Sequence, residues 1–283
     1  MGPVAYEKLQ FRRHTGYPLN LDNPTTWNEK LTARKLNPAF IEALFLQDKY
    51  ASREFVKERV GEKYLVNLYD ITDSPEKIDS SRYPSRFVLK ATNSCGASSI
   101  FIHDDPDPCP VELAKEKARA IYQKHDTMFN RFYYYSNEWW YGEIPTRLMV
   151  EELLSDGCGV VPLDYKFFVF HGRVHFIQID FGRFTNHTRA LYDRDWKKLD
   201  VRLGYPPGPG KERPVNLDEM IKVAETIAAE YHFLRVDLYN INDEEIRFGE
   251  LTIAPSLGHS KIEPVSFDHY MGSLWNYDSK EPQ

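Results

Sequence analysis

The chain has 283 residues, of which 42% are hydrophobic and 28% are charged. This length and balance indicate a soluble, globular protein with one large or two modest domains. Its net charge of -6 argues against a broad nucleic-acid-binding surface, although a local cationic pocket for phosphate remains compatible with it.

Several features of the sequence indicate the cellular compartment. The cysteines Cys95, Cys109 and Cys158 are odd in number and lack CxxC spacing, which fits a reducing compartment and argues against a zinc site. Residues 1–13 contain no apolar stretch typical of a signal peptide, and no apolar run approaches the length of a membrane span. We therefore expect a cytoplasmic protein without a membrane span and without a nucleic-acid partner.

The first part of the chain, residues 1–85, is predicted to be mainly helical. Thr26 or Asn28 is placed to cap a helix that runs to Lys35. Further helices are predicted over residues 38–46, where Pro38 stands at the start, and over residues 48–60.

From residue 86 onward the pattern changes to strands that alternate with helices. The predicted strands are 86–90, 100–102, 148–151, 164–170, 174–180, 235–238 and 246–252, and the predicted helices are 111–125 and 216–231. Antiparallel hairpins mixed with helices indicate the α+β class. We divide the chain into a helical region 1–85 and two α+β subdomains, 86–150 and 151–283.

The hairpin at residues 235–252 carries the most informative pattern. Period-two alternation places Arg235 and Asp237 on one face of the first strand. An antiparallel return is predicted to bring Glu250 beside Asp237, and two facing carboxylates repel unless a cation lies between them. Such oxygen ligands suit Mg²⁺, which typically binds one or two carboxylates together with substrate phosphates. The alternative is that these acidic residues are solvated side chains of a surface hairpin.

Two other segments suggest phosphate chemistry. The loop at residues 93–99 is rich in small residues, so its backbone N–H groups could approach phosphate oxygens, and Lys90 ends the strand before it. An ordinary β-turn with a surface lysine is the alternative. Asp164 and Lys166 share one face of their strand, either as part of a site or as a solvated pair.

Basic and acidic motifs lie in other loops. Arg183, His187 and Arg189 follow a strand end, and such a group suits a phosphate or carboxylate ligand, although a solvated charged loop is an equal alternative. The segments 105–107 and 193–195 match the DxD pattern of many glycosyltransferases, a pattern so short that chance matches are common.

Several motifs occur together in a characteristic order. They are Trp27–Leu31, Asp48–Tyr50, Arg86–Lys90, Glu138–Tyr141, Val150–Glu152, Asp164–Phe168, Arg183–His187, Gly204–Pro207, Arg235–Tyr239 and Phe248–Thr252. In this order the chain resembles the ATP-grasp superfamily, and within it the TupA-like branch named after teichuronopeptide biosynthesis. The resemblance extends from about Asn28 to Tyr270.

The resemblance implies that ATP lies between two α+β subdomains, preceded by a short helical N-terminal region. It implies that Lys49 and Lys90 hold the α- and β-phosphates and that the loop at residues 93–99 is a flap over them. The remaining implied nucleotide ligands are Ser94, Gly96 and Ser98 in that flap, Glu151 and Leu154 at the adenine, and Asp164 at the ribose.

The resemblance also implies a catalytic group and a metal site. Lys166 and Arg235 would face the transferred phosphoryl group, and Arg183 and Arg189 complete the catalytic set. The Mg²⁺ ligands would be Asp237, Glu250 and Thr252. Thr252 departs from the superfamily, which usually has Asn there, and the N-terminal region is shorter and more helical than the usual domain before the grasp fold.

The implied activity is that of an ATP-dependent carboxylate–amine ligase with an acyl-phosphate intermediate. Its partners would be ATP, Mg²⁺, a carboxylate such as a hexuronic acid and an amine such as an amino acid, in cell-surface polysaccharide modification. The alternatives are a sugar kinase on the same scaffold, a glycosyltransferase with a DxD metal site, and a non-catalytic nucleotide-binding module.

Overall fold

The computed structural model describes residues 2–37, 43–95, 99–128, 138–156, 161–182 and 185–277. Internal contacts divide the chain into two compact units that interleave along the sequence. Unit 1 comprises Met1–Ala43, Glu58–Tyr64 and Pro162–Gln283, and unit 2 comprises Leu44–Lys57 and Leu65–Val161. The predicted domain boundaries at residues 85 and 150 stay a prediction.

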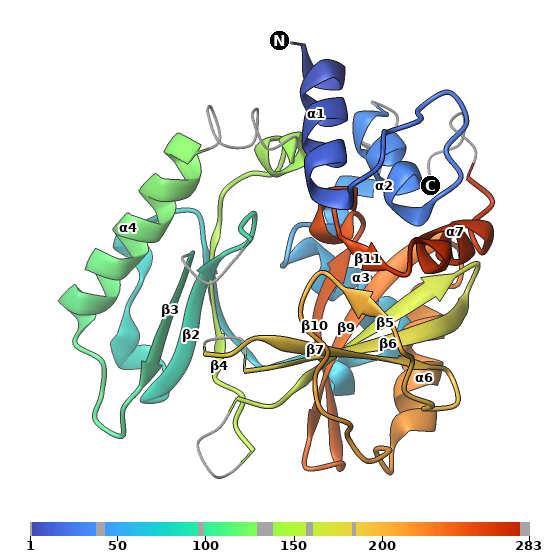
Figure 1. The fold of residues 1–283 in the computed structure, drawn as a ribbon. Helices are drawn as coiled ribbons and strands as arrows, with labels where there is room; N and C mark the ends of the chain where they lie inside the picture. Colours follow the sequence, from blue (N-terminus) through green and yellow to red (C-terminus); the bar gives the residue numbers. More distant parts are fainter. Residues whose placement is uncertain are drawn as a thin grey trace. The chain divides into compact units, whose positions relative to one another are not determined.

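Unit 2 is built on an antiparallel sheet with the strand order β1-β4-β2-β3. The strands are β1 (Leu68–Thr72), β2 (Arg86–Ala91), β3 (Ile100–Asp104) and β4 (Leu148–Glu152). Alternate residues of β2, Phe87, Leu89 and Ala91, are fully buried and pack against helix α4 (Val111–Met128), which runs along this sheet (Figure 1). The strands at 86–90, 100–102 and 148–151 are thereby confirmed, whereas β1 lies in a region predicted to be mainly helical.

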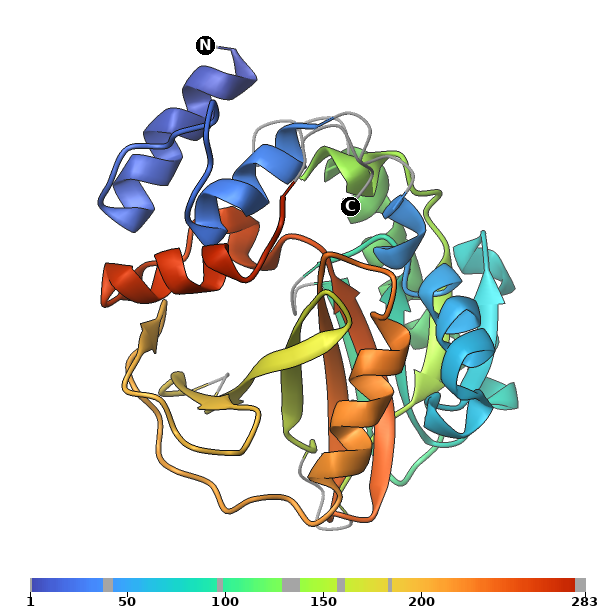
Figure 2. The ribbon, with the colours of Figure 1, turned by 90° about the vertical axis from the view of Figure 1, so that its right-hand side faces the viewer.

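Unit 1 is built on a longer antiparallel sheet with the strand order β10-β9-β5-β6-β7. Its strands are β5 (Asp164–Phe170), β6 (Arg173–Phe181), β7 (Thr188–Asp193), β9 (Phe233–Ile241) and β10 (Glu245–Thr252), and a small ribbon pairs β8 (Arg202–Leu203) with β11 (Ile262–Glu263). Helix α6 (Leu217–Ile227) covers one face of the sheet, while α2 (Trp27–Leu36) and α7 (Val265–Ser273) cover the other (Figure 2). Mixed helices and antiparallel sheets confirm the predicted α+β class.

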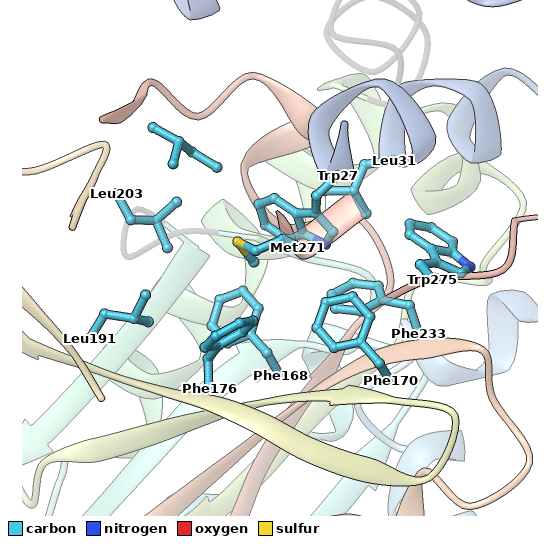
Figure 3. Close-up of a cluster of buried hydrophobic side chains, with 11 residues drawn as sticks. Trp27, Leu31, Phe168, Phe170, Phe176, Leu191, Leu203, Phe233, Met271 and Trp275 are labelled. Atoms are coloured by element: carbon cyan, nitrogen blue, oxygen red, sulfur yellow. The ribbon is translucent and has the colours of Figure 1, made fainter. Parts of the chain in front are cut away.

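The face of the unit 1 sheet toward α2 and α7 is apolar at one end. Phe168, Phe170 and Phe233 rise from the strands and meet Trp27 of α2 and Met271 of α7 in one buried cluster (Figure 3). Because side chains alternate along a strand, the residues two and four positions away on β5 and β9 lie on this same face. These are Lys166 and Asp164 on β5 and Arg235 and Asp237 on β9, so the aromatic core supports the polar half of the face.

The N-terminal helices of unit 1 are stabilised by a cap and a buried ion pair. α2 begins with a capping box, in which the Thr26 hydroxyl accepts from the Glu29 backbone N–H and the Glu29 carboxylate accepts from the Thr26 N–H. Glu7 of α1 (Pro3–Thr15) forms a fully buried ion pair with Lys35, with 2.8 Å between Oε1 and Nζ. The predicted helix is thereby confirmed, and of its two predicted caps Thr26 is the cap while Asn28 lies inside the helix.

Other predicted helices differ in their bounds. The helix predicted over residues 48–60 is α3 (Ala51–Val60), and the one predicted over 38–46 falls partly outside the described residues. Asn216 precedes α6, but its side chain does not cap the helix. Its amide instead donates to Asn240 Oδ1 at 3.0 Å and accepts from Asn240 Nδ2 at 2.9 Å. Among the described residues, no helix combines the length and the apolar character needed to cross a membrane.

Candidate functional site

The hairpin of β9 and β10 brings two carboxylates together through a β-bulge. Phe248 pairs with Leu238, but Glu250 pairs with Asp237, so Gly249 is an extra residue on β10. In a regular ladder without the bulge, Gly249 would pair with Asp237 and Glu250 would pair with Val236, on the same face as Phe248 and opposite to Asp237. The predicted meeting of Asp237 and Glu250 is confirmed, and the bulge is its structural cause.

Gly249 fits this bulge because there is little room for a side chain. A Cβ at this position would lie 3.1 Å from the Asp237 backbone oxygen and 3.1 Å from the Tyr239 ring. We expect Gly249→Val to push β10 away from β9, to cost about 1–3 kcal/mol of folding free energy and to displace Glu250. Denaturant unfolding measures the first effect, and Mg²⁺-dependent ADP release measures the second. Unchanged stability and turnover would contradict the role given to the bulge.

Asp237 is held between two buried cations. Arg235 donates to it from Nε and Nη2, each at 2.7 Å, and Lys166 Nζ donates to its Oδ2 at 2.8 Å. Burial by itself would raise the pKa of Asp237, but Arg235 and Lys166 outweigh burial and lower it. Burial acts to lower the pKa of Lys166, because it disfavours the charged form, but Asp237 and Asp164 outweigh burial and raise this pKa. Asp237 is therefore ionised and firmly oriented.

Arg235 also connects Asp237 to the rest of the hairpin. Its Nη2 lies 3.3 Å from Glu250 Oε1 and donates to Thr252 Oγ1 at 2.9 Å. The repulsion that the sequence predicts between the two carboxylates is thus offset by a guanidinium group. The side chain of Glu250 is 46% exposed, against 3% for Asp237, so Glu250 is the member that solvent and ligands can reach.

The donor set of this hairpin fits a magnesium ion carried on a triphosphate. Asp237, Glu250 and Thr252 offer two carboxylates and a hydroxyl, all oxygen donors on one face. Among the described residues, no three His, Cys, Asp or Glu side chains converge as a ready-made metal site. An ion here would accordingly take its other ligands from phosphate oxygens and water.

The polar face continues across β5, β6 and β7. Lys166 also pairs with Asp164, and its Cα partner on β6 is Gln178. Two residues further along β6, Asp180 accepts from Arg189 Nε at 2.6 Å and Nη2 at 3.1 Å. Burial acts to raise the pKa of Asp180, but Arg189 outweighs it and lowers this pKa to about 2.

Arg189 has a different environment from the one its motif suggests. Besides Asp180, its guanidinium group donates to the Leu203 carbonyl at 3.0 Å and lies 4.7 Å from the centre of the Tyr205 ring. These contacts orient Arg189 toward the protein rather than toward a ligand. Arg183 lies outside the described residues. His187 stacks on Tyr205 with 3.6 Å between ring centres, a contact between segments that no local sequence signal foretells.

Unit 2 gathers most of the predicted nucleotide ligands. Lys90 on β2 forms an ion pair with Glu151 on β4, and Arg53 Nη1 lies 3.8 Å from the same carboxylate. Lys49 donates to the Ser94 carbonyl at the start of the small-residue loop. Leu154 is buried, while Gly96 and Ser98 lie outside the described residues.

Buried polar contacts fix the start of the small-residue loop, and sequence reasoning missed them. The Asn93 amide donates to Thr146 Oγ1 at 2.9 Å and to the Ile144 carbonyl at 3.2 Å. Arg147 donates to Asp48 Oδ2 at 2.6 Å, next to Lys49. The start of the small-residue loop and the residue before Lys49 are therefore both anchored to the segment that leads into β4.

The two DxD segments form local turns. Asp193 Oδ1 accepts from the backbone N–H groups of Asp195 and Lys197 at 3.0 and 2.8 Å, and Asp105 Oδ1 accepts from the Asp107 N–H at 2.9 Å. A side chain that caps its own turn is the ordinary structural use of such aspartates. This geometry gives no support to the glycosyltransferase alternative.

Comparisons with known structures find ATP-grasp ligases at low identity. D-cycloserine synthetase DcsG is 12% identical, with a TM-score of 0.44 over 81% of this chain and 70% of that chain. D-alanine–D-alanine ligase from Bacillus anthracis is 14% identical, with a TM-score of 0.44 over 75% and 58%. The ADP complex of N5-carboxyaminoimidazole ribonucleotide synthetase is 13% identical, with a TM-score of 0.45 over 74% and 45%.

This chain spans about half the length of two of these known structures, 45% of N5-carboxyaminoimidazole ribonucleotide synthetase and 58% of D-alanine–D-alanine ligase. No curated protein matches the chain. The model of the TupA-like ATP-grasp family, in contrast, matches residues 29–276, which is nearly the whole sequence. The chain therefore belongs to the TupA-like ATP-grasp family.

Proposed function

We propose that the protein is an ATP-dependent carboxylate–amine ligase that works through an acyl phosphate. The observation that carries this proposal is the polar face of unit 1, where the bulge at Gly249 sets Glu250 beside Asp237. Arg235 and Lys166 lie on that face in direct contact with Asp237. Two carboxylates and two cations on a rigid sheet suit phosphoryl transfer, which depends on placement and charge neutralisation.

The residues of unit 1 have distinct roles in this proposal. A substrate carboxylate attacks the γ-phosphate of ATP, and Arg235 and Lys166 offset the negative charge of the transferred group. Asp237, Glu250 and Thr252 would hold magnesium, which when bound would neutralise phosphate oxygens. Asp164 keeps Lys166 in place and is the proposed contact of the ribose.

The residues of unit 2 are proposed to hold the nucleotide. Lys49 and Lys90 bind the α- and β-phosphates, Ser94 and the loop that follows it cover them, and Glu151 and Leu154 meet the adenine. Lys90 is supported by its ion pair with Glu151, because a lysine fixed at a strand end loses less freedom when a phosphate arrives.

The proposed substrates are a hexuronic acid and an amino acid, joined during cell-surface polysaccharide modification in the cytoplasm. An ADP-release screen over uronic acids and amino acids tests this. We expect release that needs both an acid and an amine, and an amide product. ADP release with a sugar that lacks a carboxylate, without any amine, would instead favour the sugar kinase.

Lys90 offers a test of nucleotide binding. We expect Lys90→Ala to weaken ATP binding by about 1.5–3 kcal/mol, the usual value of a charge-assisted hydrogen bond, which corresponds to at least about tenfold. Titration calorimetry with ATP measures the affinity, and Lys115→Ala, at a partly exposed lysine of α4, is the control. Equal affinities for both variants would remove Lys90 from the nucleotide site.

A further inference from the structure

A second polar cluster lies on the same face of the unit 1 sheet as Asp237, and the proposed function gives this cluster no role. It consists of Asp180 at the end of β6, His187 and Arg189 at the start of β7, and Tyr205 after β8. Nε2 of His187 lies 3.2 Å from Asp180 Oδ1, at ion-pair distance, and the imidazole stacks on Tyr205. We call these four residues the His187 cluster.

The imidazole of His187 is oriented with one nitrogen inward. Its Nε2 is buried and makes no hydrogen bond to a described residue, although Asp180 Oδ1 lies 3.2 Å away, whereas the side chain as a whole is 20% exposed, so the exposure lies on the rest of the ring. A carboxylate beside one ring nitrogen favours the tautomer with the proton on that nitrogen, and leaves the other as an acceptor. Asp180 is suited to this task, because Arg189 holds it in the ionised form.

The His187 cluster lies close to the groups that face the transferred phosphate. Gln178 is the strand partner of Lys166, and its Nε2 donates to Asp180 Oδ2 at 3.0 Å. Asp180 follows on the same face, about 7 Å further along the strand at the usual rise per residue. Lys166 also contributes to the lowered pKa of Asp180. A proton acceptor at this place would be within reach of a nucleophile that approaches the acyl phosphate.

We propose that His187 is the catalytic base that takes a proton from the amine substrate, with Asp180, Arg189 and Tyr205 as positioning residues. This inference rests on the proposed ligase function. The ammonium group gives one proton to Nδ1 of His187, and the free amine attacks the acyl carbon. The C–N bond forms, the C–O bond to phosphate breaks, and the second amine proton leaves with the phosphate as HPO₄²⁻.

The test compares two nucleophiles with the same acyl phosphate. Amino acids are protonated at neutral pH and need a base, whereas hydroxylamine is largely unprotonated and does not. With D-glucuronate or D-galacturonate as the acid, we expect His187→Gln to lower amide formation about 100-fold and to leave hydroxamate formation unchanged. His187→Asn is a second variant, and His269→Gln, on the exposed side of α7, is the matched control.

The outcomes separate this inference from the proposed function. Hydroxamate from the wild-type protein supports an acyl phosphate, and its absence with every acid tested contradicts the ligase function itself. If hydroxamate forms but the His187 variants lose amide and hydroxamate to the same degree, His187 is structural and the inference is wrong. Unchanged amide formation in these variants also overturns it.

Discussion

Glu250→Gln is expected to lower ADP release at least about 100-fold while leaving the fold as stable as in the wild-type protein. The side chain of Glu250 is half exposed, and its contact with Arg235 Nη2 is long, at 3.3 Å. Replacing the carboxylate with an amide therefore removes little folding energy, because an exposed ion pair contributes about 1 kcal/mol or less. It does remove a charged oxygen ligand from the proposed magnesium site.

A matched control lies on the same strand. Glu245 is an exposed residue of β10 whose carboxylate pairs with Arg247 at 2.8 Å, away from Asp237. We expect Glu245→Gln to keep both turnover and stability. Equal turnover in the Glu250→Gln and Glu245→Gln proteins, measured at saturating Mg²⁺ and ATP, would show that Glu250 is not a metal ligand.

Asp237→Asn is expected to behave differently from Glu250→Gln. The amide would turn a donor toward Arg235 or Lys166 and leave two buried cations without their main counter-charge. Breaking a buried ion pair on one side costs about 3–5 kcal/mol, so this variant should lose stability as well as turnover. Thermal unfolding separates the two effects, and full stability would contradict the buried network.

Gly272→Ala is expected to destabilise unit 1 by about 3 kcal/mol. The Cβ would lie 2.1 Å from the Thr25 carbonyl oxygen and 2.8 Å from the Thr26 carbonyl carbon, both backbone atoms just before α2. α7 and α2 would have to separate, and both carry residues of the aromatic cluster beneath the polar face. Helix propensity alone would give the opposite result, because alanine stabilises a helix by about 1 kcal/mol relative to glycine. A loss of stability would therefore report the contact between the two helices.

The measurement is urea unfolding, with Gly210→Ala as the control. Nothing lies within 4 Å of a Cβ at Gly210, so this variant should stay within about 0.5 kcal/mol of the wild-type protein. If the Gly272→Ala protein unfolds at the same urea concentration as the Gly210→Ala protein, α7 does not pack against the segment before α2 as closely as described.

Local patterns predicted the elements that make up the site. Alternation in Arg235–Leu238 placed Arg235 and Asp237 on one face, and Asp164 and Lys166 followed the same rule on β5. Thr26, one of the two caps predicted, does begin α2, because a helix cap is a contact between residues a few positions apart. Such features depend on neighbours in the chain, so one sequence suffices to find them.

The site itself depends on contacts that no local pattern encodes. The meeting of Glu250 with Asp237 needs the bulge at Gly249, which strict alternation along β10 would not predict. Arg189 stands in a motif that suits an external anion, yet Asp180, nine residues earlier in the chain, binds its guanidinium group. His187 acquires its stacking partner only because β8 brings Tyr205 alongside.

The amino-acid sequence by itself determined the family, the α+β class and the hairpin with its acidic residues, because these follow from residue order and short-range periodicity. Only the tertiary structure decided which charges neutralise one another. Arg235 and Lys166 hold Asp237, Lys90 holds Glu151 and Arg189 holds Asp180. The physical reason is that charges buried away from water must find partners, and the available partners are set by strand order and register.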